Sequence, residues 1–176
     1  MSNIVYIATS LDGFIAREDG SIDWLMEIPN NDNSDFGFGE FMESIDAIVM
    51  GKNSFEMVVS FGEWPYSKPV FVLSNSLHKI PDNLIGKVEI LNGNPISIIK
   101  KLNSRQFFNL YIDGGKVIQQ FLELGLIDEM TITKIPIVLG SGIPLFTKGS
   151  SEQKFEHVKT EVFQNSLVKS HYKKSG

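Results

Sequence analysis

The sequence predicts an α/β protein whose central sheet is mostly parallel and ends in an antiparallel hairpin. Short apolar, β-branched runs recur along the first two thirds of the chain, with helical stretches between them. Continuous apolar runs are typical of strands buried on both faces of a parallel sheet. A different, alternating pattern follows Gly125. The repeated order of strand, helix and strand is the signature of the α/β class.

The expected parallel strands are the apolar runs at residues 4–9, 47–51, 70–74, 88–91 and 110–113. Helices are expected between them, at 35–44, at 54–60, from Asn94-Pro95 onward and at 116–124. Asp35 and Asn94 are residue types that cap helix N-termini, and Pro95 suits a first helical position. Gly125 suits the residue that follows a helix end.

The last third of the chain predicts antiparallel strands. Residues 129–139 alternate as one long strand that contains Pro136. Residues 155–163 and 168–172 flank Gln164-Asn165-Ser166 and are expected to form a hairpin. The longest irregular stretch, residues 21–39, is rich in Asn, Asp and Gly, and loops of this length are often functional lids.

Composition narrows the functional classes. The 176 residues (19.7 kDa) are expected to form one domain, residues 1–176. No apolar run approaches the ~20 residues of a membrane span, and residues 1–9 lack a signal-peptide pattern, so we expect a cytoplasmic protein with no membrane partner. The absence of Cys excludes disulfides, and three scattered His predict no metal site. A net charge of -5 argues against a nucleic-acid partner.

Charge is unevenly distributed along the chain. Residues 1–46 carry ten acids and one base, whereas residues 89–176 carry eleven bases and eight acids. Two interpretations remain open. The acidic part is a solvated face, or the later part of the chain holds an anionic ligand.

Three strand-to-helix turns carry the residues best suited to a phosphorylated ligand. Asp113-Gly114-Gly115-Lys116 follows an apolar run and opens a helix, where free N–H groups favour anions. The alternative is a tight turn that needs glycine only for its backbone angles. The segments at 50–56 and 74–76 have a similar layout. Because the carboxyl ends of parallel strands meet at one edge, the three turns predict a groove for a phosphorylated nucleotide.

An ordered set of motifs spans nearly the whole chain and resembles the dihydrofolate reductase superfamily. The likeness is closest to the branch related to the reductase domain of the riboflavin-biosynthesis deaminase-reductase. The motifs are SLDGFIA at 10–16, VMGKNSFE at 49–56, VLS at 72–74, YIDGG at 111–115, IDE at 127–129 and PIVLGSGIPLF at 136–146. The resemblance implies a three-layer fold, an NADPH cofactor and oxidoreductase activity.

The resemblance also implies cofactor-binding positions. Ala8 and Ile15 would border the nicotinamide, and Gly114 and Gly115 would hold the pyrophosphate. Lys52 stands where the family usually has Arg and would meet the 2'-phosphate; its charge favours NADPH over NADH. The remaining cofactor candidates lie in the same three turns: Gly51, Asn53, Ser54, Ser74, Asn75, Lys116 and Val117.

Catalytic and substrate positions follow from the same likeness. The family's acid lies sixteen residues before the glycine of the Met-Gly turn, which here is Asp35. Its partner on the later strand would be Thr133. A helix cap is the alternative for Asp35. For Asp12, in an Asp-Gly dipeptide, a turn is the stronger interpretation.

Trp24 and Phe36 are the expected substrate contacts. Trp24 would form part of a closing lid, or would only cover a core edge.

The predicted function is an NADPH-dependent reductase that passes hydride to a pterin-like or aminopyrimidine-like substrate. Lys68 stands where folate reduction uses Arg, and a chain without Cys contains no zinc deaminase. Weak dihydrofolate reduction and a non-catalytic NADPH-binding module are the alternatives. A homodimer is implied, because relatives commonly pair and the C-terminal strands carry Phe146, Phe155 and Phe163.

Overall fold

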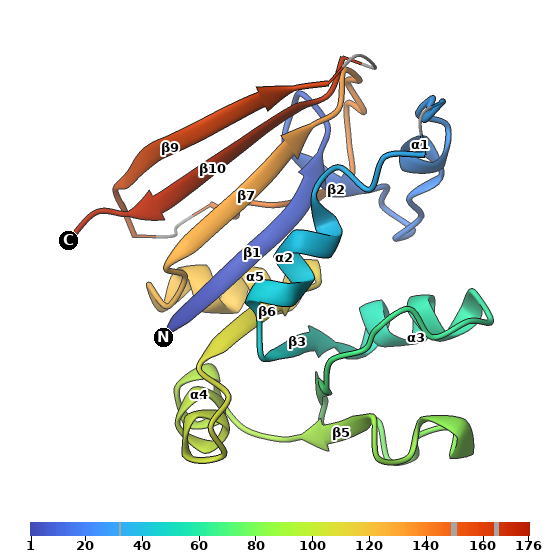
Figure 1. Cartoon of the computed structure of the whole chain (residues 1–176), viewed down its shortest axis with the longest axis vertical. Helices are drawn as coiled ribbons and strands as arrows, with labels where there is room; N and C mark the ends of the chain where they lie inside the picture. The colour runs from blue at the N-terminus through green and yellow to red at the C-terminus, as the bar shows by residue number, and fades with distance from the viewer. Residues whose placement is uncertain (32, 149–150, 164–165) are drawn as a thin grey trace.

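The computed structural model describes residues 1–31, 33–148, 151–163 and 166–176. Its described strands form an eight-stranded sheet in the order β5-β4-β3-β6-β1-β7-β10-β9 (Figure 1). The strands from β5 to β7 run parallel, and β10 and β9 pair antiparallel at one edge. The sheet consists of β1 (Ser2–Thr9), β3 (Ala47–Gly51), β4 (Val70–Leu73), β5 (Val88–Leu91), β6 (Asn109–Asp113), β7 (Glu129–Lys134), β9 (Phe155–Val162) and β10 (Val168–Lys174).

Helices cover both faces of the sheet and make three layers (Figure 1). On one face, α2 (Phe38–Ser44) and α3 (Lys52–Ser60) pack on a core around Ile48 and Met50. On the other, α4 (Pro95–Ser104) and α5 (Gly115–Glu123) pack on a core around Val49 and Ile112. Because neighbouring residues of β3 serve opposite faces, its run is apolar throughout, as expected of a strand buried on both sides.

A small second sheet fastens two loops together. β2 (Phe14–Ala16) pairs antiparallel with β8 (Ile143–Pro144). A Cβ on Gly142 would lie 2.3 Å from the carbonyl oxygen of Ala16, so only glycine fits this approach. The sequence did not predict this pairing, because each strand is too short to carry a periodic pattern.

The predicted α/β class, the five parallel strands and the helices between them are confirmed. Asn94 caps α4, since its side-chain oxygen accepts the N–H of Ser97 at 2.9 Å. Gly125 follows α5 with φ +64°. The remaining elements are the four-residue helix α1 (Asp23–Met26), inside the stretch expected to be irregular, and a 3-10 turn at Asp82–Leu84. No helix in the described ranges is both long and apolar enough to cross a bilayer.

Two predicted boundaries differ from the structure by three residues or more. The strand expected at 129–139 ends at Lys134, because Pro136 has no N–H for a further ladder bond. The helix expected at 35–44 begins at Phe38, since Phe36 and Gly37 have φ of +53° and +84° and lie outside helical backbone. Of the expected hairpin, Gln164 and Asn165 lie outside the described residues.

Candidate active site

β3 and β6 lie side by side at the carboxyl edge of the sheet, and the place where the helices after them diverge is the crevice position of open α/β sheets. The helices that follow them go to opposite faces: Phe55 of α3 packs in the core around Ile48, and Val117 of α5 in the core around Ile112. Open α/β sheets bind ligands at such a divergence of neighbouring strands. The structure therefore brings the predicted turns at Gly51 and Gly114 to one edge.

The two turns approach each other closely. Gly114 has φ +86°, and a Cβ on it would lie 2.4 Å from the Oγ of Ser54 and 3.6 Å from the backbone nitrogen of Gly51. A Cβ on Gly115 would lie 2.7 Å from Ile15, and one on Gly51 would lie 3.2 Å from Val117. The turn itself thus needs glycine at 114, by backbone angle and by contact, whatever the ligand.

Both helices at the crevice begin without a side-chain cap. The N-cap residues are Gly51 for α3 and Gly114 for α5, and neither helix has a side-chain hydrogen bond from its cap. The first-turn N–H groups of both helices therefore have no capping acceptor from the N-cap residue, an arrangement that suits an anion.

The other predicted cofactor residues surround this edge. Ser74 follows β4, which pairs with β3 next to Gly51, and its Oγ accepts the N–H groups of Ser76 and Leu77 at 3.1 and 2.9 Å. Lys52 lies 3.7 Å from Glu56 of the next helical turn. The side chains of Asn53, Asn75 and Lys116 are exposed.

A second group of predicted residues meets on the sheet face under α2. Thr133 lies opposite Ala8 on one side and Lys169 on the other. Trp24 is buried (2% exposed), and Ala8 and Phe36 pack against its cluster. In the described structure Trp24 thus packs over a core edge beside the predicted residues Ala8 and Phe36. Its Nε1–H has no hydrogen-bond partner among the described residues.

Asp35 caps α2. Its carboxylate accepts the N–H groups of Gly37 and Gly39, both at 2.9 Å. These bonds lower the pKa of Asp35, whereas a carboxyl group desolvated in a nicotinamide pocket would have a raised pKa. Thr133 lies next to Ala8 in the sheet, and the hydrogen bonds of Asp35 support the cap interpretation.

Asp12 holds two loops together. Its carboxylate accepts the hydroxyl of Ser10 at 2.6 Å and the N–H groups of Leu139 and Gly140 at 3.1 and 2.8 Å. These bonds, that of Ser10 foremost, lower the pKa of Asp12 to about 2. The interpretation of Asp12 as a turn residue is the one that its contacts support.

Asp113 is the carboxylate that the sequence analysis did not select. It ends β6 directly before Gly114, and burial raises its pKa, an effect that the N–H of Gly114 partly offsets. Its charge in turn helps to raise the pKa values of Tyr66 and Tyr111, for which burial is the larger cause. The available signal was an acid that ends an otherwise apolar strand at a Gly-Gly turn.

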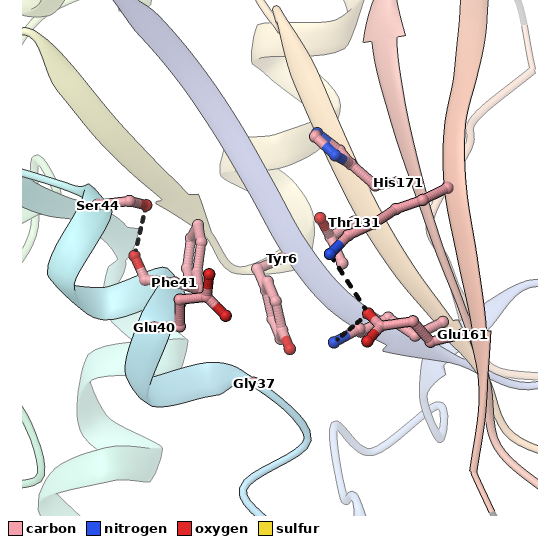
Figure 2. Close-up of a pocket in the computed structure, with 10 residues that line it drawn as sticks. Tyr6, Gly37, Glu40, Phe41, Ser44, Thr131, Glu161 and His171 are labelled. Carbon is pink, nitrogen blue, oxygen red and sulfur yellow. Dashed lines mark hydrogen bonds and ion pairs between the residues drawn. The ribbon is translucent and has the colours of Figure 1, made fainter.

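A cavity of about 210 Å³ lies beside α2, from Gly37 before its first residue to Ser44 at its end (Figure 2). Figure 2 shows Tyr6 and Phe41 on the α2 side, opposite Thr131 and His171. Burial is the main cause that raises the pKa of Tyr6 to about 12. The other lining residues are Glu40, Lys159, Glu161 and Lys169. The sequence contained a signal for this cavity wall: Lys159 and Glu161, and likewise Lys169 and His171, are two residues apart in a strand, so each pair lies on one face of the sheet.

Metal ligation finds no support in the described ranges. They contain no group of three or more His, Cys, Asp or Glu side chains arranged to hold an ion.

The layers, the sheet and the crevice define a protein with the dihydrofolate reductase-like fold. Dihydrofolate reductase from Enterococcus faecalis, solved with NADP(H) and RAB-propyl, superimposes with a TM-score of 0.64 over 99% of this chain and 97% of that chain, at 15% identity. Residues 3–169 match the RibD C-terminal domain family, and the chain belongs to this family.

Closer relatives cover all or nearly all of the chain. A crystal structure of a protein provisionally named as a riboflavin biosynthesis protein, from Shewanella sp. PV-4, is 50% identical with a TM-score of 0.95, and all of both chains is covered. The uncharacterized protein YwjB of Bacillus subtilis (strain 168) is 37% identical over 96% of this chain and 95% of its own length.

A more distant structure includes a reductase. The deaminase/5-amino-6-(5-phosphoribosylamino)uracil reductase of Thermotoga maritima has a TM-score of 0.74 at 18% identity, covering 99% of this chain and 56% of that one. At 18% identity this likeness concerns the fold, and the family supports a reductase-like role.

The close approach at Gly114 generates a test of the turn. We expect Gly114→Val to lower the thermal unfolding midpoint more than Gly86→Val. Gly86 has φ +83° but nothing within 4 Å of its Cβ position, so its variant carries the backbone strain alone, roughly 1–2 kcal/mol. Gly114→Val adds the collision with Ser54. Circular dichroism melts measure both unfolding midpoints. Equal decreases in the two variants would show that the contact with Ser54 does not contribute to stability.

Proposed function

We propose that this protein is an NADPH-dependent reductase that passes hydride to a pterin-like or aminopyrimidine-like substrate. The crevice between β3 and β6 carries the proposal, because two glycine turns, two uncapped helix N-termini and Lys52 meet there. Backbone N–H groups and a nearby cation suit the pyrophosphate and the 2'-phosphate of a dinucleotide. The reductase-like role of the family is consistent with this function.

The residues at the crevice fit such a cofactor. Gly114 and Gly115 pack closely against Ser54 and Ile15, which brings the first turn of α5 next to the first turn of α3. The pyrophosphate would lie on the first turn of α5, with Lys116 beside it and Ser54 at the start of α3. Lys52, with Ser74 and Asn75, would meet the 2'-phosphate, and Ala8 and Ile15 would border the nicotinamide ring.

The bound cofactor would supply the hydride, and the protein would hold the acceptor and handle the proton. Trp24 and Phe36 cover the stretch of Ala8 and Thr133, so they would exclude water from the acceptor. The polar cavity beside α2 offers hydroxyl, carboxylate and ammonium groups for a substrate with donors and acceptors on its edge.

A carboxyl group that moves a proton works best when its pKa is raised toward the working pH. Asp35 is exposed and bound by two N–H groups, which lower its pKa. Asp113 ends β6 beside β1, two residues after Tyr111, whose hydroxyl donates to the carbonyl of Tyr6, and burial raises the pKa of Asp113 there. We therefore assign the proton role to Asp113 rather than to Asp35.

The direct test is NADPH oxidation at 340 nm with dihydrofolate, aminopyrimidine phosphates and small carbonyl compounds as acceptors. Turnover of an aminopyrimidine or a pterin would support the proposal. NADPH binding without hydride transfer to any acceptor would support the alternative, a non-catalytic NADPH-binding module.

We expect NADPH to bind more tightly than NADH because Lys52 can pair with the 2'-phosphate, a charge-assisted contact of roughly 1.5–3 kcal/mol. Titration by protein fluorescence measures both affinities. Lys52→Ala should weaken NADPH binding and leave NADH binding unchanged. The matched control is Lys101→Ala on α4, where Lys101 lies 3.8 Å from Glu89. Equal affinity of the native protein for the two cofactors would contradict the assignment.

We expect Asp113→Asn to lower turnover by roughly 10²–10⁴-fold, the usual contribution of a general acid or base. Because the pKa of Asp113 is raised, turnover of the native protein should fall as the pH rises through that value. This limb of the pH–rate profile should vanish in the variant. Asp35→Asn is the matched control, since Asn is itself a good cap and should keep activity. The reverse result would return the proton role to Asp35.

We also propose a homodimer that pairs through the outer edge of β9. β9 ends the sheet, and its Val158 and Val162 are 48% and 72% exposed. A twofold pairing centred on Thr160 would set Lys159 opposite Glu161 of the second copy. Phe155 and Phe163 pack inward, against the large core and Phe36, and leave Phe146 as the exposed member of the predicted set.

Light scattering at micromolar concentration should give the mass of a dimer. Val162→Lys should give a monomer, because a lysine on an edge strand opposes strand addition. Phe146→Lys is the control, since Phe146 is exposed but lies outside β9. A monomeric native protein would refute the pairing.

A further inference from the structure

The backbone carbonyl of Phe36 is held by two donors from the sheet. The hydroxyl of Tyr6, on β1, donates to it at 3.0 Å, and the ammonium of Lys169, on β10, donates at 2.7 Å. Phe36 precedes α2, and Figure 2 shows Tyr6 directed toward the Gly37 end of that helix. A loop carbonyl is thus fixed by side chains from two strands.

The ammonium of Lys169 is enclosed by its partners. Lys169 is only 9% exposed, and besides the carbonyl of Phe36 it contacts the carboxylate of Glu161 at 2.9 Å and lies 5.3 Å from the centre of the Phe163 ring. A Cβ on Gly37 would lie 2.9 Å from its Nζ. An ammonium with this little exposure is retained only when it is paired and hydrogen-bonded. We name Lys169, Tyr6, Glu161 and the Phe36 carbonyl the Phe36 clamp.

Phe36 itself has a backbone conformation that bulky residues rarely adopt. Its φ is +53°, in the left-handed region. Such a conformation persists only when the surrounding structure over-determines it, and it is often found where a segment has a functional position to keep. The two bonds to its carbonyl supply that constraint.

The local hydrogen bonds around Phe36 fix the conformation of residues 34–39 but do not attach this segment to the sheet. The amide of Asn30 bonds the backbone of Ser34, the hydroxyl of Ser34 accepts the N–H of Phe36, and Asp35 caps α2. All of these partners lie within a few residues of one another in the sequence. Attachment to the sheet comes from the Phe36 clamp and from apolar packing.

That packing lies over the stretch assigned above to the nicotinamide and the acceptor. Phe36 meets Phe163 edge-on at 5.1 Å, and with Ala8 it packs against the cluster of Trp24. Trp24 is buried, yet its Nε1–H has no partner among the described residues. A buried donor without a partner disfavours the closed position unless other contacts hold it.

We propose that Lys169 is a positioning residue whose bond to the Phe36 carbonyl holds Phe36 and Trp24 closed over Ala8 and Thr133. Release of this carbonyl lets Phe36 leave its left-handed conformation and exposes the indole of Trp24. The ammonium of Lys169, on β10, is thus the charged donor that holds the closed position, and it lies far from Phe36 in the sequence. The identity of the ligand that would bind at Ala8 and Thr133 rests on the proposed function. The role of the Phe36 clamp does not rest on it.

The test uses Trp24 as the reporter. The chain has two Trp, so Trp64→Phe gives a protein whose indole signal comes from Trp24 alone. In this background, Lys169→Met keeps an unbranched apolar chain but removes the ammonium. Lys159→Met is the matched control, because Lys159 pairs with the same Glu161 at 3.7 Å, and Phe36 is not among its partners. Lys169→Arg should restore the closed state through its retained donors.

Loss of a charge-assisted bond should lower the closed-to-open ratio by roughly ten- to hundredfold. Acrylamide quenching of Trp24 should then rise toward that of an exposed indole in Lys169→Met, below its melting transition and with an unchanged far-UV spectrum. Lys159→Met and Lys169→Arg should quench like the parent. Unchanged quenching in Lys169→Met, or an equal rise in Lys159→Met, would overturn the proposal.

A second variant covers the case in which Lys169→Met does not fold. Tyr6→Phe removes the other donor to the Phe36 carbonyl without unpairing a charge, and it should give a smaller rise in Trp24 quenching. No rise in that variant would then overturn the proposal. The quenching measurements use no cofactor or substrate, so they test the Phe36 clamp even if the protein lacks the proposed reductase activity.

Discussion

The side-by-side placement of β3 and β6, with their helices leaving toward opposite faces, is the constraint on which the rest of the structure depends. The two turns are so close that Gly114 has no room for a side chain against Ser54. The same closeness directs the first turns of α3 and α5 into one crevice. The close approach of the two turns therefore explains both the need for glycine at position 114 and the anion-binding geometry of the two helix N-termini.

Burial separates the three aspartates at the carboxyl edge. Asp12 and Asp35 are exposed and accept backbone N–H groups, so their pKa values are lowered and their bonds are structural. Asp113 ends a central strand where desolvation outweighs the single N–H of Gly114, so its pKa is raised. The residue type is the same in all three cases, and the difference in burial and hydrogen bonding changes the direction of the pKa shift.

The antiparallel end of the sheet does more than extend it. β9 and β10 bring Glu161, Lys169 and His171 to the face where α2 lies, and these side chains complete the wall of the cavity (Figure 2). Lys169 also reaches the loop that precedes α2. The last strands of the chain thus fix the position of a segment from its first quarter, over the residues assigned to the nicotinamide and the acceptor.

The sequence by itself determined the α/β class, the parallel strands, the cap of α4 and the convergence of the glycine turns, because these follow from local periodicity and from residue types with fixed backbone preferences. It did not determine the start of α2, the role of Asp35 or the importance of Asp113 and Lys169. Those depend on which distant side chains meet. The carbonyl of Phe36, a residue with left-handed backbone, accepts bonds from Tyr6 and Lys169, and burial raises the pKa of Asp113. Only the tertiary structure sets such contacts and such desolvation, since neither is encoded within a window of neighbouring residues.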